Sequence, residues 1–277
     1  MSSLRPVLRR RATCPPWLRC EILRGGLLAL RLVPLVAEYH RPASLDEALE
    51  LLGSPRRVAL AGGTMLNADR EPSDLEAVDL QALGLDTIAA TDAGRVRIGA
   101  TATLDAVRRC ELLGDSLRDL ARAEQPSTLR TLATVGGLVA KASSESLLLA
   151  ALLAHDAQVE LVGSSAAAAE SGLAGLLATG VPRGSLVTAV TVDPSGRTAT
   201  ARTGRTPADV PIVAAYGRRI EGFAAVALTG VADHPVLVDV GDPTSGLNPA
   251  GDFRGSREYR LHLAGTLTAR VMQELHL

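Results

Sequence analysis

Residues 60–64 read Leu60-Ala-Gly-Gly-Thr64 and complete a short apolar segment that begins at Val58. A strand that ends in two glycines can present consecutive backbone N–H groups to an anion, because no Cβ stands in the way, and the Thr64 hydroxyl adds another donor. A phosphate group is the natural ligand of such a turn. The alternative is a plain tight turn, since most strands that end in Gly-Gly bind nothing there.

A second glycine pair lies further along the chain, within Thr134-Val-Gly136-Gly137. The residues before it are polar and include Ser127, Thr128 and Arg130. Two loops of this kind indicate an extended ligand with more than one polar portion. Tight turns over a close-packed helix are the alternative, and the glycine spacing alone leaves both open.

The segments around the two loops have the patterns of both helices and strands. Ser44-Leu-Asp-Glu47 forms a capping box and predicts a helix start, and Thr103 can cap a helix from Leu104. Residues 147–153 are apolar all round, which indicates a buried helix. We predict strands at 57–61, 77–80, 95–100, 158–162, 186–192, 198–202, 212–218, 223–230 and 236–240, and helices at 117–124 and, after Ser256, at 259–275. The alanine-rich segment 166–178 is uninformative, and 203–211 is expected to link two domains.

The composition is that of a globular protein with an aliphatic core. Of the 277 residues, 47% are hydrophobic but only 2% are aromatic, so Leu, Val, Ile and Ala must fill the core. The 29 basic and 30 acidic residues give a net charge of -1, which offers no positive field to hold a nucleic acid. Lys141 is the only lysine, a bias that we attribute to genome composition and not to function.

Cysteine usage and hydropathy bear on location. Cys14, Cys20 and Cys110 form no CxxC pair, which favours a reducing cytoplasm and argues against a cysteine-only metal or iron–sulfur site within this chain. No apolar run approaches the ~18 residues that a membrane span needs. We therefore expect a soluble, cytoplasmic protein without a membrane span.

Residues 1–36 differ from the rest of the chain. They are rich in arginine and proline, and Glu21 is their only acidic residue. The apolar residues 27–30 resemble part of a signal peptide, but Arg31 interrupts them and a cleavage pattern is missing. We expect a disordered extension here, with a targeting segment as the alternative.

The sequence has no pattern for a catalytic nucleophile, a metal site or a P-loop. Its five histidines are scattered without an HxxxH pair, and Walker and GxGxxG motifs are absent. Asp69, Glu71, Asp74 and Glu76 are spaced like the residues of a solvated loop. We predict neither a catalytic side chain nor a metal site in this chain.

The order of the segments resembles that of one known family. From about Tyr39 to the C-terminus, the chain is similar to the flavoprotein (medium) subunit of the molybdenum hydroxylases, the family of xanthine dehydrogenase and carbon monoxide dehydrogenase. The resemblance rests on Tyr39-His-Arg-Pro-Ala-Ser-Leu-Asp-Glu-Ala-Leu49, Leu60-Ala-Gly-Gly-Thr64, Val78-Asp-Leu80, Arg97-Ile-Gly-Ala-Thr101, Thr103-Leu104, Ala133-Thr-Val-Gly-Gly137, Asp252-Phe-Arg-Gly-Ser256 and Glu258-Tyr-Arg260. Order, spacing and extent together make the match specific.

The resemblance implies an α+β fold. A two-subdomain FAD-binding unit of the PCMH type would be followed by a small domain of antiparallel strands and a helix. We therefore expect an extension at 1–36, an FAD-binding domain at 37–203 with a subdomain boundary near residue 90, and a C-terminal domain of the carbon monoxide dehydrogenase flavoprotein type at 204–277.

The resemblance also implies FAD as the cofactor, held between the two subdomains. By position, its contacts would be Ala61, Gly62, Gly63, Thr64, Met65, Ile98, Thr101, Thr103, Thr134, Val135, Gly136 and Gly137. The backbone of residues 61–65 would hold the pyrophosphate, and the second glycine loop would form another contact. The flavin supplies the redox chemistry, while the protein binds and orients it.

Partner chains are implied in the same way. A subunit of this family takes electrons from a small 2Fe-2S subunit, works beside a large subunit that binds the molybdenum cofactor, and passes electrons to NAD, a quinone or another acceptor. The substrate of the complex is set by the molybdenum subunit. The chain alone is therefore an oxidoreductase subunit and not a complete enzyme.

The chain departs from the family pattern around the second glycine loop. Before the loop, Thr131 stands for the family's Asn and Ser127-Thr128 for its Pro-Gln, whereas Arg130 is kept. Two polar contacts to the cofactor are lost after it. Leu138 stands where the family has Asn after the second glycine pair, and Leu147 where it has an Asp that bonds the ribityl chain. Each missing hydrogen bond weakens binding by about 1 kcal/mol. Glu145 would replace the Asp if the loop register shifts by two residues.

Two alternatives to an electron-transfer flavoprotein follow. The first is a flavin-deficient structural or assembly subunit that keeps the fold, which the two leucines suggest. The second is a phosphate-binding or nucleotide-binding module without redox chemistry, which rests on the glycine loops alone.

Overall fold

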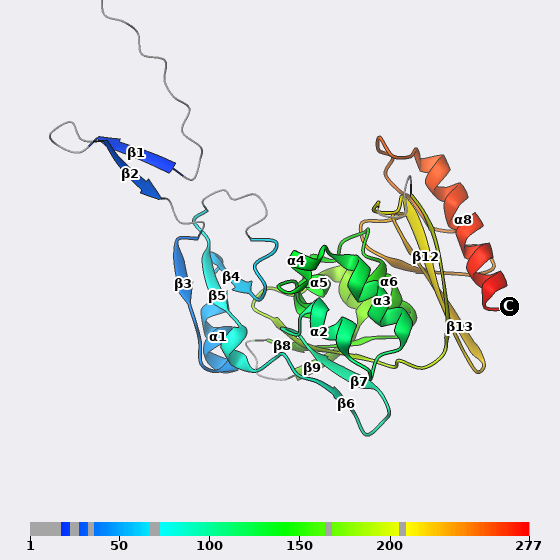
Figure 1. Ribbon diagram of the computed structural model, residues 1–277, viewed down its shortest axis with the longest axis horizontal. Helices are drawn as coiled ribbons and strands as arrows, with labels where there is room; N and C mark the ends of the chain where they lie inside the picture. Colours follow the sequence, from blue (N-terminus) through cyan, green and yellow to red (C-terminus); the bar gives the residue numbers. More distant parts are fainter. Residues whose placement is uncertain are drawn as a thin grey trace, which may run out of the picture.

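The computed structural model describes residues 18–22, 28–32, 36–66, 73–163, 168–204 and 209–276. Within the expected N-terminal extension, two strands pair antiparallel, β1 (Leu18–Ile22) and β2 (Leu28–Leu32). The other residues up to 35 lie outside the described part, as do Asp69 and Glu71 of the acidic loop. From residue 36 onward, three α/β units follow one another along the molecule (Figure 1).

The first unit is a three-stranded parallel sheet with one helix. Its elements are β3 (Glu38–His40), α1 (Leu45–Leu52), β4 (Arg57–Leu60) and β5 (Glu76–Asp79), and the strand order is β3-β5-β4. The Ser44 hydroxyl accepts a hydrogen bond from the Glu47 N–H and so caps α1, as predicted. The Glu47 carboxylate reaches back to the N–H of Ala43, one residue before the usual partner in a capping box. Strand β4 of this unit ends at the first glycine loop.

The second unit carries most of the core. A five-stranded antiparallel sheet has the order β6-β7-β10-β8-β9, and its helices gather on one side of it (Figure 1). The strands are β6 (Ile88–Ala90), β7 (Val96–Gly99), β8 (Gln158–Val162), β9 (Ala168–Gly172) and β10 (Leu186–Val192). The helices are α2 (Leu104–Arg109), α3 (Asp115–Glu124), α4 (Ser127–Arg130), α5 (Val135–Lys141), α6 (Leu147–Ala154) and α7 (Leu173–Thr179). The short helix η1 (Gln81–Leu83), which follows β5, packs through Leu83 against the core of the first unit. The buried α6 is the apolar helix that the sequence predicted.

The third unit is a four-stranded antiparallel sheet between two helices. Its strands β11 (Arg197–Thr203), β12 (Val213–Ile220), β13 (Phe223–Thr229) and β14 (Val236–Val238) pair in chain order. Helix α8 (Arg257–Glu274) covers the outer face, and α6 lies against the other (Figure 1). Alternation along the strands builds both interfaces: Tyr216 and Ala227 belong to the α6 core, whereas Ala215 and Leu228 belong to the α8 core.

This pairing changes the expected domain boundary. Strand β11 was assigned to the FAD-binding domain, but it pairs along its length with β12 and is therefore part of the C-terminal sheet. The segment 203–211, predicted as a domain linker, instead connects two neighbouring strands of one sheet. The chain crosses between units just before Arg197, at the turn that contains Pro194.

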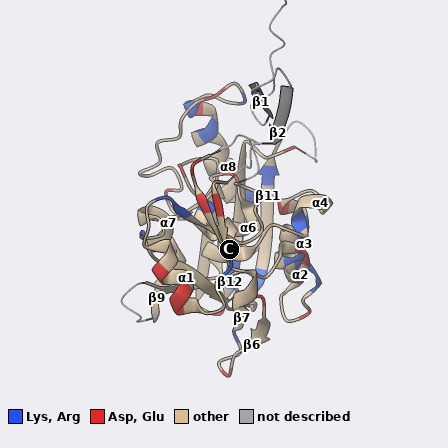
Figure 2. Ribbon diagram, turned by 90° about the vertical axis from the view of Figure 1, so that its left-hand side faces the viewer, with Lys and Arg blue, Asp and Glu red and all other residues tan. Residues whose placement is uncertain are grey.

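Two further features concern the surface. Acidic and basic residues are interspersed along the ribbon (Figure 2), in keeping with the net charge of -1. No helix in the described part of the chain is long and apolar enough to cross a membrane.

On α8, Leu263, Leu267, Val271 and Leu275 are buried as predicted, whereas Tyr259, assigned to the same face, is 42% exposed.

Candidate functional site: a cavity beside two glycine loops

A cavity of about 240 Å³ lies between the first and second units. One wall is the loop after β4, residues 59–66, and another is α5 with the residues just before it. Leu186 and Val187, at the start of β10, are also part of the lining, and Leu104 of α2 contributes another apolar surface. The walls are thus mainly apolar, with backbone and hydroxyl groups at the glycine-rich end.

The two glycine loops pack against the protein closely. A Cβ on Gly62 would lie 1.7 Å from the carbonyl oxygen of Leu132, and a Cβ on Gly136 would lie 2.7 Å from the Cβ of Ala100. Both glycines are therefore required by chain packing, whatever the cavity binds. The alternative that the sequence allowed, a tight turn held by close packing, is thus present at both positions, and the cavity lies beside both turns.

The backbone donors of the two loops differ. In the second loop, the N–H groups of Val135 and Gly136 donate to the carbonyls of Ala102 and Ala100, and that of Gly137 donates to the Thr134 hydroxyl. The first turn of α5 therefore has its donors satisfied within the protein. By contrast, the N–H groups of residues 62–65 donate to no described residue. Among the described residues, the first loop alone thus has backbone donors without a protein partner that could serve a ligand in the cavity.

The residues expected at the cofactor fall into two groups. The structure brings together eight of them in the cavity lining: Ala61, Gly62, Gly63, Thr64, Met65, Thr134, Gly136 and Gly137. Five lie elsewhere: Ile98, Thr101, Thr103, Val135 and Glu145.

Each of the five has a visible structural role. Ile98 and Val135 are buried in the central core, and Thr101 is buried with its N–H bonded to the Leu85 carbonyl. Thr103 caps α2 by accepting from the N–H of Ala106. Thr103 and Val135 directly precede or follow residues of the lining, Leu104 and Thr134, and the N–H of Leu104 donates to the carbonyl of Ala133, which also lines the cavity.

Glu145 belongs to a second, adjoining cavity of about 420 Å³. The two cavities share Gln125, Leu138 and Lys141. Glu145 is ion-paired with Arg254 of the C-terminal unit, and it would have to share or give up this contact to replace the expected Asp. Leu138 is only 8% exposed and Leu147 packs against the core, so both leucines present apolar surface to the second cavity.

Sequence reasoning missed several lining residues. Gln125 lies at the start of the polar stretch but was not singled out, and Leu186 and Val187 lie on a strand that is predicted from its apolar pattern alone. Lys141 had been set aside as a compositional remnant. A strand pattern says which residues are half-buried, but not which cavity they border.

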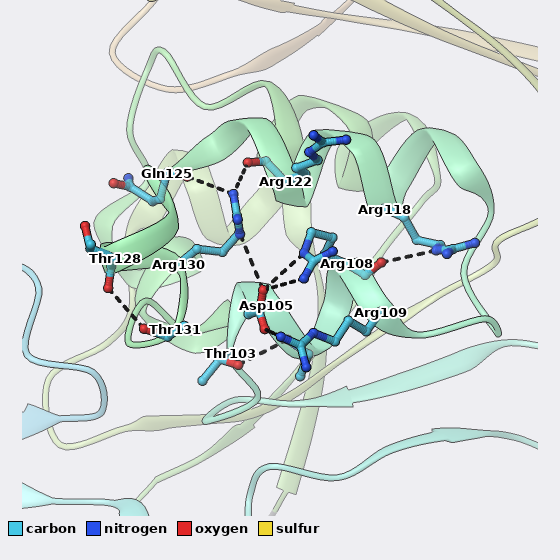
Figure 3. Close-up of polar contacts among 11 residues, drawn as sticks. Thr103, Asp105, Arg108, Arg109, Arg118, Arg122, Gln125, Thr128, Arg130 and Thr131 are labelled. Carbon is cyan, nitrogen blue, oxygen red and sulfur yellow. Dashed lines mark hydrogen bonds and ion pairs between the residues drawn. The ribbon is translucent and has the colours of Figure 1, made fainter.

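Three arginines, Arg108, Arg109 and Arg130, surround Asp105 near the Gln125 end of the cavity (Figure 3). Arg130 donates to the backbone carbonyls of Arg122 and Gln125, at 2.6 and 3.3 Å, and its Nε lies 3.6 Å from the Asp105 carboxylate. Arg108 and Arg109 also pair with Asp105, and hydrogen bonding from Arg108 is the main reason that the pKa of Asp105 is lowered. The ionised Asp105 thereby ties α2 to the end of α3 and to α4.

The second cavity contains the carboxyl group of Glu124, whose pKa is raised, whereas that of Asp105 is lowered. Burial raises the pKa of Glu124, and its carboxylate accepts a hydrogen bond from the N–H of Leu148 at the start of α6. The nearby Lys141 opposes that rise through its charge. Glu124 therefore anchors α6 and lies within the electrostatic reach of Lys141.

One group in the described residues has the composition of a metal site. Side-chain ligand atoms of Glu38, His40 and Glu76 lie within 4.8 Å of one another. Glu76, however, accepts hydrogen bonds from Arg56 at 2.7 Å and Arg57 at 2.8 Å, and the Arg57 bond is the main reason its pKa is lowered. Two guanidinium groups already balance this carboxylate, so we assign no metal to the group.

The free N–H groups, the two threonine hydroxyls and the apolar walls together suit a cofactor that bears both phosphate and an apolar ring. The comparison with known proteins identifies that cofactor. Residues 35–194 match the family described as FAD binding domain in molybdopterin dehydrogenase, and the chain belongs to this family of oxidoreductase subunits, whose cofactor is FAD. The resemblance to the molybdenum hydroxylases is thus confirmed, and the match ends just before β11, where the structure also places the change of unit.

Similar proteins extend the comparison over the whole fold. The chain is 31% identical to the uncharacterized protein YgfM of Escherichia coli K12 over 252 residues, which cover 85% of this chain and 95% of that protein. It is 28% identical to the carbon monoxide dehydrogenase medium chain of Afipia carboxidovorans over 284 residues, which cover 87% and 97%. Both matches include the C-terminal unit as well as the FAD-binding part.

Solved structures agree on the fold. The cyanide-inactivated Cu,Mo-CO dehydrogenase matches with a TM-score of 0.75 and 25% identity, covering 87% of this chain and 98% of that one. Quinoline 2-oxidoreductase from Pseudomonas putida 86 also gives a TM-score of 0.75, at 22% identity, over 86% of this chain and 96% of that one. The predicted fold class, an FAD-binding domain followed by an antiparallel sheet with a helix, is confirmed.

Proposed function

We propose that this chain is the FAD-binding, electron-transfer subunit of a molybdenum hydroxylase complex. Its partners would be a large subunit that binds the molybdenum cofactor and a small 2Fe-2S subunit, which delivers electrons to FAD. The external acceptor would be NAD, a quinone or another carrier. The observation that carries the proposal is the cavity itself, since it lies within the family segment and is lined by residues 62–65, whose N–H groups donate to no described residue.

The chain's own residues would hold and orient the cofactor. The N–H groups of Gly62, Gly63, Thr64 and Met65 would bind the pyrophosphate, and the Thr64 and Thr134 hydroxyls would add donors. The Thr134 hydroxyl keeps its proton free for donation, because it accepts from Gly137. Leu104, Leu186 and Val187 would exclude water from the ring. FAD, when bound, supplies the electron storage, and this chain sets its position and surroundings.

A flavin-deficient subunit with the same fold is the second candidate. Leu138 and Leu147 favour it, because both present apolar surface where the family has polar contacts to the cofactor, and Glu145 is held by Arg254. Such a chain would still join the complex but would carry no electrons.

One experiment separates the candidates. A tagged full-length chain is isolated from its natural host under mild conditions, and the isolated material is analysed for flavin, iron and molybdenum. The proposal predicts all three together. Iron and molybdenum without flavin would favour the structural subunit, and the absence of both metals would contradict both candidates.

A further inference from the structure

Lys141 differs from the other residues of the cavity lining in its charge. It is the last residue of α5 and the only charged residue among the described residues that line the first cavity. It also lines the second cavity, as does Leu138. The two residues are three positions apart on α5, so their side chains share one face of the helix.

The Lys141 ammonium group has no ion-pair partner among the residues that the structure describes, although its charge is felt by the Glu124 carboxyl group. Two further acids line the second cavity: Glu145, which is already paired with Arg254, and Asp209, which has an interaction of its own. Within the described part of the chain, the cavity therefore presents one positive charge that no ion pair neutralises.

The residue type adds an independent argument. The chain has 29 basic residues, of which Lys141 alone is lysine. A lysine carries a compact point charge on a flexible stem, whereas a guanidinium is a wide planar fork. In a chain that otherwise uses arginine throughout, this position carries the smaller cation, on an exposed side chain that borders both cavities.

We infer that Lys141 is a cofactor-binding residue, whose ammonium group pairs with a negative charge of FAD. The inference rests on the proposed function. FAD brings negative charge on its pyrophosphate, and its ring gains negative charge on reduction, while the N–H groups of residues 62–65 are neutral donors. A charge-assisted contact in an apolar cavity is stronger than a neutral one. Lys141 thereby offsets the apolar surface of Leu138 beside it.

The single lysine allows a direct test by chemical labelling. The full-length chain is treated with an amine-reactive ester with and without saturating FAD, and the rate of labelling at Lys141 is measured by peptide mass spectrometry. The chain's α-amino group serves as the internal control. We expect FAD to slow labelling of Lys141 at least tenfold and to leave the α-amino group unchanged. Protection by ADP would assign the contact to the phosphates, and protection by riboflavin would assign it to the ring.

Variants give a second readout. Lys141→Gln should raise the Kd for FAD about tenfold, and the effect should shrink as salt concentration rises. Lys141→Arg keeps the charge and should stay within threefold of the parent. Both variants should melt like the parent chain, because Lys141 has no ion pair to lose.

The outcomes separate the two proposals. If the chain binds FAD but Lys141 is labelled at the same rate and the Gln variant binds equally well, the role of Lys141 is overturned and the proposed function stands. If the chain binds no FAD at all, both are overturned.

Discussion

Replacing Gly62 by alanine tests the link between chain packing and the cavity. The added Cβ would lie 1.7 Å from the Leu132 carbonyl oxygen and 2.6 Å from its carbon, both backbone atoms. To reach even 3.0 Å from that oxygen, the loop and the segment before α5 must separate by 1.3 Å (3.0 minus 1.7). The flexible end of a side chain could move aside, but here two stretches of backbone must shift.

The cost follows from overpacking, which destabilises by about 1–3 kcal/mol. At about 2–4 °C per kcal/mol for a chain of this size, the melting temperature should fall by about 4–8 °C for a cost near 2 kcal/mol. The same shift moves the free donors of residues 62–65 away from Thr134 across the cavity. Loss of about 1.4 kcal/mol of binding weakens the FAD affinity tenfold.

Gly175→Ala is the matched control. Gly175 is exposed within α7, and its added Cβ would meet no atom within 4 Å. Alanine is favoured over glycine in a helix by about 0.5–1 kcal/mol, so this variant should be slightly more stable and should bind FAD like the parent. Thermal unfolding and FAD titration of both variants provide the comparison. A Gly62→Ala chain that matches the parent in melting temperature and in FAD affinity would refute the reasoning.

Three further predictions concern the supporting structure. Arg130→Ala removes the donors to the carbonyls of Arg122 and Gln125 and should weaken FAD binding about fivefold, a cost of about 1 kcal/mol. The control, Arg122→Ala, keeps its carbonyl and should bind FAD like the parent chain. Equal affinities of the two variants in a FAD titration would contradict this prediction. His155 is buried and neutral, with its pKa lowered to about 4 by burial, so folding should lose about 2–3 kcal/mol as pH falls from 7.5 to 4.5, because the unfolded chain takes up the proton first. Urea unfolding at the two pH values should show a smaller loss for His155→Gln, and an equal loss would count against the assignment. The pKa of Asp252 is lowered chiefly by hydrogen bonding from Arg260, so its contribution to folding stability is present above pH 4 and is lost at lower pH. Asp252→Asn should therefore be less stable than the parent at pH 7 and equally stable in acid. Parallel curves of stability against pH for the two chains would exclude this role.

Much of the fold was predictable because local signals and tertiary structure agree. Ser44, Thr103 and Ser256 cap helices where the sequence placed them. The strands β8 and β10 begin and end at the predicted residues, since glycines or turns bound their apolar runs. Between them, β9 and α7 were missed, because an alanine-rich segment carries no hydrophobic period.

The domain boundary and the cavity depended on long-range contacts. The sequence of β11 is a strand pattern that does not say which sheet it joins, and pairing with β12 settles this. The glycines of the two loops were found, but a sequence cannot show that Gly62 and Gly136 are fixed by backbone packing while only the first loop keeps free donors. Resemblance likewise predicted Ile98, Thr101, Thr103 and Val135 at the cofactor, and none of these four is part of the cavity lining.

Binding of FAD by the full-length chain tests the central claim most directly. The purified chain is incubated with FAD, freed of excess by gel filtration, and examined for flavin absorbance against protein concentration. The account predicts close to one FAD retained per chain, with less retained by Gly62→Ala. A folded chain that emerges without flavin absorbance would contradict it.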